Sequence, residues 1–168
     1  MGIFRDLNAE EIDVRIATIT EKGLSLLLYK DARVDQDILD ETIGEFNWQR
    51  KHTRDNANCI VEIWDDKKGQ WISKEDTGTE SFTEKEKGLA SDSFKRACFN
   101  WGIGRELYTA PFIWVSADKC NIYEKNGKKA CNDKFIVEKI EITNKVITGI
   151  AIYNTTTKQR VFVYTKEK

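Results

Sequence analysis

Three strand patterns in a row, followed by a helix pattern, most constrain how this chain can fold. Turn sequences rich in Asp, Asn, Lys and Gly separate the three strand patterns, which occupy residues 47–55, 58–66 and 70–78. In the middle one, apolar residues alternate with mixed ones, which predicts one buried and one partly exposed face. Strands joined by such short turns pair antiparallel. The sequence therefore predicts an antiparallel meander that leads into a helix.

The helix after the meander has a clear apolar face. Thr83 and Glu86 have the spacing of a capping box, and Gly102 is placed to end the helix. The apolar residues recur at steps of three and four: Ala90, Phe94, Ala97, Cys98 and Trp101. We expect this face to pack on the meander.

The remaining patterns complete an α+β fold class. Residues 23–30 form a short apolar strand pattern, and residues 32–46 have helical spacing with Gly44 as a C-cap. Three further strand patterns close the chain: 135–143, 145–154 and 160–165. We expect an antiparallel β-meander packed on a long helix, a β-β-β-α core, with additional C-terminal strands.

Composition is that of a globular protein in the cytoplasm. The chain has 168 residues, which suits a single domain, and 33% of them are charged and 40% hydrophobic. No apolar run is long enough to span a membrane, and the N-terminus becomes acidic too soon for a signal peptide. Four cysteines without a CxxC pair, and a single histidine, argue against a zinc site and predict no metal.

The cysteines divide into two kinds by their surroundings. Cys59 and Cys98 lie in apolar patterns and are expected in the core. Cys120 and Cys131 flank a polar stretch, where a bridged hairpin is one alternative. In a reducing compartment we favour two free thiols.

Charge is unevenly distributed along the chain. Residues 1–47 contain five basic and eleven acidic residues, a net charge of −6, whereas residues 48–168 have a net charge of +5. A basic body leaves room for a polyanion on a local surface.

A basic pair lies on the outer side of the second helix. On a helical wheel, Lys95 and Arg96 point away from the apolar face, and Phe99 lies between them. Basic groups next to an aromatic ring are suited to the phosphates and bases of single-stranded nucleic acid. The alternatives are an ordinary solvated helix face, and a Phe99 that packs on another subunit.

A second basic cluster lies in the first strand of the meander. Arg50 and Arg54 are expected on one face of that strand and Lys51 on the other. These charges could equally protect an edge strand against aggregation.

Catalytic motifs are few. There is no phosphate-binding GxxxxGK[ST] loop, and no nucleophile is near His52 in the sequence. Asp65, Asp66 and Lys68 contain the acid-x-Lys pattern of metal-dependent nucleases of the restriction type, which also need an upstream acid to hold Mg²⁺. A metal-dependent nuclease, or another DNA-processing enzyme, is therefore the alternative function.

The stretch from residue 76 to 108 resembles the single-strand annealing proteins of the Rad-fifty-two type, particularly their short bacteriophage relatives. The resemblance lies in an [ST]-D-[SAG]-[FL]-K-R-A core, an aromatic-glycine exit and a preceding strand that ends at a glycine. The matching residues of the helix motif are Ser91, Asp92, Phe94, Lys95, Arg96, Ala97, Trp101 and Gly102. With the upstream helix, the resemblance covers residues 23–110 of one annealing domain and leaves the C-terminal strands, 111–168, without a role.

The resemblance implies a non-enzymatic protein that assembles into a homo-oligomeric ring. Such proteins bind single-stranded DNA in a positive groove and anneal complementary strands in recombination and repair, without ATP or a cofactor. Lys95 and Arg96 would contact phosphates, and further DNA-binding candidates are Lys30, Arg33, Arg50, Lys51 and Arg54. A cellular single-strand-binding protein is a candidate partner, and a bacteriophage protein would work in the host cytoplasm. A plain interaction domain is a third possibility.

Overall fold

The computed structural model describes residues 2–79 and 85–167, and within helix α2 it describes side chains from Gly88 on. In these residues the chain has the expected α+β class, with two α-helices and eleven strands in four small antiparallel sheets. It divides into two compact units. Unit 1 contains Met1–Arg5 and Asp31–Gly104, and unit 2 contains Asp6–Lys30 and Arg105–Lys168.

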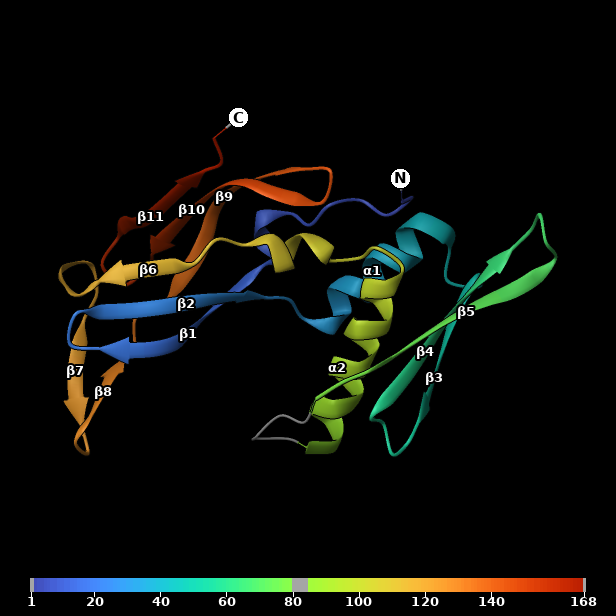
Figure 1. Cartoon of the computed structure of the whole chain (residues 1–168), viewed down its shortest axis with the longest axis horizontal. Coiled ribbons are helices and arrows are strands. Elements are labelled where there is room, and N and C mark those ends of the chain that lie inside the picture. Colours follow the sequence, from blue (N-terminus) through green and yellow to red (C-terminus); the bar gives the residue numbers. More distant parts are fainter. Residues whose placement is uncertain (1, 80–84, 168) are drawn as a thin grey trace. The chain divides into compact units, whose positions relative to one another are not determined.

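Unit 1 contains both α-helices and one three-stranded sheet. Helix α1 comprises Ala32–Ile43 and helix α2 comprises Lys85–Asn100. The sheet has the strand order β3-β4-β5, from Trp48–Thr53, Asn58–Asp65 and Gln70–Thr77. Helix α2 contacts β4 and β5, and lies beside the sheet in Figure 1. The three strands predicted between residues 47 and 78 are therefore present, each slightly shorter than expected.

Helix α1 has a recognisable cap residue at each end. Asp31 accepts a hydrogen bond from the backbone N–H of Arg33 at 2.8 Å, which satisfies one of the unpaired donors at the N-terminus. Gly44 has φ +87° and is the predicted C-cap, because glycine reaches this region without steric cost. The helix therefore stops at Ile43, three residues before the end of the predicted pattern.

The core of unit 1 lies between the sheet and α2. Val61 on β4 is fully buried, as are Phe94, Ala97 and Cys98 on α2. The ring of Trp48 on β3 stacks on Phe94 with 5.9 Å between centroids. The predicted apolar face of the helix thus packs on the sheet, while the capping box predicted at Thr83 and Glu86 lies outside the described residues.

Unit 2 consists mainly of strands. One sheet has the order β1-β2-β6, from Asp13–Thr20, Gly23–Tyr29 and Ile113–Ser116, and the second has the order β11-β10-β9, from Gln159–Thr165, Val146–Asn154 and Phe135–Thr143. The two sheets contact each other through β1 with β9 and β6 with β11. Strands β7 (Ile122–Lys125) and β8 (Lys128–Cys131) form a hairpin. Of three short 3-10 helices in the described residues, η1 (Ala9–Glu11) precedes β1, η2 (Arg105–Thr109) precedes β6 and η3 (Ala117–Lys119) follows β6.

The C-terminal meander was predicted correctly, whereas the sequence predicted no partner for the strand of residues 23–30. Strand β2, which corresponds to the pattern expected at residues 23–30, pairs with β1 and β6 in unit 2. Strands β1 and β6 were not predicted from the sequence. None of the residues of β1 is buried, and β6 has only four residues.

The cysteine side chains are present as thiols. None of the four cysteines forms a disulfide, and burial raises the pKa of Cys59 and of Cys120 to about 11. Among the residues that the structure describes, none of the helices has the length and apolar character needed to cross a membrane.

Candidate nucleic-acid interface

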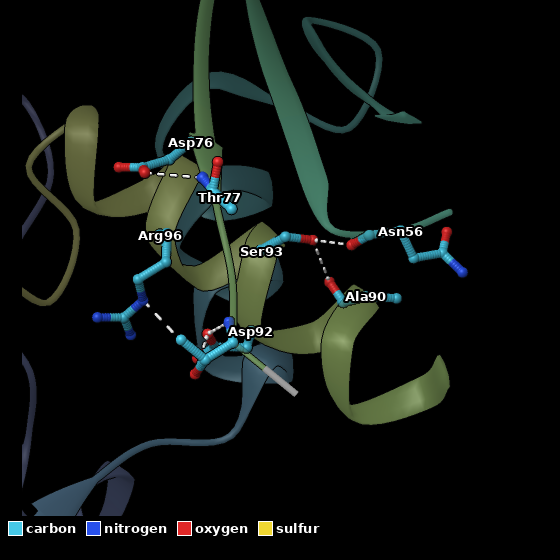
Figure 2. A network of polar contacts seen from close by, with 8 residues as sticks. Asn56, Asp76, Thr77, Ala90, Asp92, Ser93 and Arg96 are labelled. Carbon is cyan, nitrogen blue, oxygen red and sulfur yellow. Dashed lines mark hydrogen bonds and ion pairs between the residues drawn. The ribbon is translucent and has the colours of Figure 1, made fainter. Parts of the chain in front are cut away.

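Helix α2 places the predicted basic pair at the margin of the helix–sheet core. Lys95, Arg96 and Phe99 are all half-buried, rather than fully exposed as the helical wheel suggests. The side chain of Arg96 is 28% exposed, and its Nε lies 3.8 Å from Oδ1 of Asp92, one helical turn earlier. The cation is therefore oriented by a neighbour on its own helix (Figure 2).

Asp92 also fastens the end of β5 to the helix. Its Oδ2 accepts a hydrogen bond from the backbone N–H of Thr79 at 2.8 Å. Beside it, Gly78 lies so close to α2 that a Cβ atom would stand 2.5 Å from the backbone nitrogen of Ser93. Glycine is needed here because the strand crosses the helix backbone with no room for a side chain. The sequence motif contained Asp92, but its contact with Thr79 could not be predicted from it.

Ser93 holds the turn between β3 and β4 against α2. Its fully buried hydroxyl lies 2.8 Å from the carbonyl oxygen of Asn56 and 3.2 Å from that of Ala90 (Figure 2). The backbone N–H of Gly78 donates to the carbonyl of Ala57 in the same turn at 2.8 Å. Asp92 and Ser93, adjacent in the sequence, thus anchor both loops at this end of the sheet.

Arg54 lies in that turn rather than on a strand. Strand β3 ends at Thr53, and Arg54, Asp55 and Asn56 all have positive φ, between 51° and 71°. A left-handed turn breaks the alternation of a strand, so the prediction that Arg54 shares a strand face with Arg50 was wrong. The side chain of Arg54 is exposed at the end of the hairpin.

Two cations from the edge strands lie on aromatic rings of the helical segment. Arg50 on β3 and Lys74 on β5 face each other across Val61 on the side of the sheet that packs on α2. The Arg50 guanidinium carbon lies 4.6 Å from the centre of the Phe94 ring, and Lys74 Nζ lies 4.6 Å from the centre of the Trp101 ring. Such cation–π contacts hold a positive charge at a fixed position.

Lys74 was not predicted from the sequence. Its Nζ also donates to the carbonyl oxygen of Asn100 at 3.2 Å, at the C-terminus of α2. In the sequence, Lys74 is one polar residue of an alternating strand pattern. Its position beside Trp101 and Asn100 depends on the register of β5 against β4 and on where α2 ends. Only the folded chain provides both.

The other predicted basic residues do not join this group. Lys51 points to the opposite face of the sheet, where its Nζ lies 3.4 Å from Oε2 of Glu62. Arg33 is exposed at the start of α1, and its Nε is 3.9 Å from Asp31. Lys30 is only 4% exposed, so we do not include it in the interface, because a buried ammonium group cannot reach a phosphate in solvent.

His52 is a residue of β3, and its Nδ1 lies 3.3 Å from Oγ of Ser93 on α2. Burial lowers the pKa of His52, and the charge of Arg50 lowers it further. Ser93 Oγ has two backbone carbonyls within hydrogen-bonding distance and is wholly buried, so it lacks the access that a nucleophile needs. Ser93 therefore has a structural role: with His52 and Asn56 it joins the end of β3 and the following turn to α2.

Asp65 is the last residue of β4, and Asp66 and Lys68 lie in the turn that leads to β5. Asp65 Oδ1 accepts hydrogen bonds from the backbone N–H groups of Lys67 and Lys68, at 2.9 and 3.1 Å. Asp66 Oδ1 accepts the indole N–H of Trp64 at 2.7 Å. Both carboxylates therefore have structural roles in the hairpin. Within residues 2–79 and 85–167, no three His, Cys, Asp or Glu side chains gather closely enough to hold a metal ion.

Comparison of the chain with known protein families, with characterised proteins and with solved structures gave no match.

Proposed function

We propose that this protein binds single-stranded DNA along α2 and anneals complementary strands without ATP or a metal ion. In this proposal β3, β4, β5 and α2 form the β-β-β-α core of an annealing domain of the Rad-fifty-two type. Lys95 and Arg96 contact phosphates, Arg50, Arg54 and Lys74 extend the positive surface, and Phe99 stacks on a base. The activity is one of binding and pairing rather than of covalent catalysis.

The observation that carries the proposal is the way α2 is held. Arg50 and Lys74 lie on rings of the helical segment, and Asp92 and Ser93 tie the loops around it to the helix. These contacts hold positive groups at fixed positions on a rigid support, which is suited to the phosphates of a flexible polyanion. Phe94 is fully buried, so the half-buried Phe99 is the ring proposed to meet the bases. The affinity for an oligonucleotide is then set by charge rather than by its base sequence.

Assembly into a homo-oligomeric ring is part of the proposal. In the described part of the chain, β3 and β5 each pair with β4 only, so each has one edge without a strand partner in its sheet. Exposed strand edges favour pairing with another chain unless they are covered. We therefore expect copies of the protein to cover each other's edges, and light scattering of the full chain to give a multimer of the 19.4 kDa protomer.

The test is a double change, Lys95→Ala with Arg96→Ala, in the full-length protein. We expect weaker binding of single-stranded oligonucleotides of any sequence. The slope of log affinity against log salt should fall by roughly 1 to 1.5 units, since each phosphate contact on a single strand contributes about 0.7. Strand annealing is measured in EDTA without ATP, and should be reduced in proportion to binding.

A matched control removes two lysines from the hairpin of unit 2. Lys128→Ala with Lys129→Ala causes the same loss of charge at two exposed positions of β8, and should leave affinity and salt slope nearly unchanged. Equal effects of the two double variants would show that only net charge matters. Cleavage of the oligonucleotide in Mg²⁺, abolished by Asp66→Ala, would support the nuclease instead.

A further inference from the structure

Asp92 is a negative charge placed within the proposed DNA interface. Its Oδ1 lies 3.8 Å from Nε of Arg96, and its Oδ2 accepts the backbone N–H of Thr79 at 2.8 Å. Because Gly78 is pressed against the backbone of Ser93, the segment that Asp92 holds has little room to move. The carboxylate therefore cannot turn away from Arg96 without releasing the end of β5 (Figure 2).

We propose that Asp92 lowers the affinity of this site for single-stranded DNA by competing with phosphate for Arg96. The inference rests on the proposed function. A phosphate that reaches Arg96 also meets the carboxylate, and the two anions repel each other. The side chains of Asp92 and Arg96 are 26% and 28% exposed, so water and salt screen this repulsion less than on an open surface.

A weakened contact fits the work of an annealing protein. Two strands must shift against each other until their bases pair, and a phosphate contact that is too strong would hold each strand in its first position. The neighbouring acid, Asp76, is engaged differently: its two oxygens accept hydrogen bonds from the N–H of Thr77 and the side-chain amide of Asn100. Asp92, in contrast, has a carboxylate oxygen 3.8 Å from Nε of Arg96, so its charge acts directly on that cation.

The substitution Asp92→Asn separates the two roles of this residue. The amide oxygen of asparagine can still accept the N–H of Thr79, while the negative charge is gone. We measure affinity for an oligothymidine at several salt concentrations. We expect binding about three- to tenfold tighter than in the unaltered protein, and a salt slope steeper by up to roughly 0.7 unit. In the background of Arg96→Ala the same change should give no gain.

Two controls keep the test decisive. Asp76→Asn makes the same change of net charge close by, and any gain it causes should not depend on Arg96. If Asp92→Asn does not fold, Asp92→Gln provides an uncharged amide oxygen on a side chain long enough to reach Thr79, and the same gain is expected from it.

Several outcomes would overturn the inference. A folded Asp92→Asn protein that binds DNA equally or more weakly would do so, and so would a gain that persists without Arg96. If Lys95→Ala with Arg96→Ala leaves DNA binding unchanged, or the unaltered protein does not bind, the proposed function fails and the inference with it. If that double variant weakens binding but Asp92→Asn has no effect, only the inference fails.

Discussion

Replacing Gly78 by alanine should disturb the crossing of β5 over α2. The new Cβ would stand 2.5 Å from the backbone nitrogen of Ser93, 2.9 Å from its Cα and 3.0 Å from the carbonyl carbon of Asp92. All three are backbone atoms of a packed helix, so the strand end has to move rather than its neighbour. The hydrogen bonds from Thr79 to Asp92 and from Gly78 to Ala57, both 2.8 Å long, would lengthen with it.

The expected loss of stability follows from these contacts. Overpacking costs about 1–3 kcal/mol and a weakened hydrogen bond about 0.5–1.5 kcal/mol. Alanine restricts the unfolded chain and offsets about 0.4–1 kcal/mol. We therefore expect the free energy of unfolding to fall by about 1.5–3 kcal/mol.

Urea unfolding measured by tryptophan fluorescence reports on the affected unit. Four of the five tryptophans lie in unit 1: Trp48, Trp64, Trp71 and Trp101. Gly149→Ala is the matched control, because the nearest atom to its new Cβ, at 3.1 Å, is a side-chain oxygen of Glu141 that can rotate away. Its cost, followed by circular dichroism, should stay below about 1 kcal/mol. Equal stability of Gly78→Ala and the unaltered protein would refute the close approach described here.

Three further predictions follow from the same region and from the thiols. Ser93→Ala removes the buried donor to Asn56 and should lower the free energy of unfolding by about 1–3 kcal/mol, measured in urea, whereas an unchanged midpoint would show that the turn does not depend on this contact. Because burial and Arg50 lower the pKa of His52 below its ordinary value of about 6.5, stability should be complete above that pH and decrease as pH falls through the lowered value. His52→Gln should remove this dependence in unfolding curves recorded between about pH 7 and 5. With pKa values of about 11, Cys59 and Cys120 should react slowly with iodoacetamide at pH 8 in the native protein, and rapid labelling of either would contradict their burial.

The sequence by itself determined the strands and helices that have strong local patterns. Alternation and turn residues located β3, β4 and β5 to within a few residues, and also the C-terminal meander. Glycine at Gly44 ended α1 as predicted, because the positive φ there is a local requirement. Periodicity also identified the buried face of α2, including Phe94 and Cys98. Each of these depends on neighbours close in the chain.

The tertiary structure decided the features that depend on residues far apart in the chain. The pairing of β2 with β1 and β6, the stacking of Arg50 on Phe94 and that of Lys74 on Trp101 depend on register and on which face meets which helix. For Asp92, the sequence motif contained the residue but not its contacts with Thr79 and Arg96. Local patterns report which side of an element is buried, whereas the partner on that side is selected by packing of the whole chain.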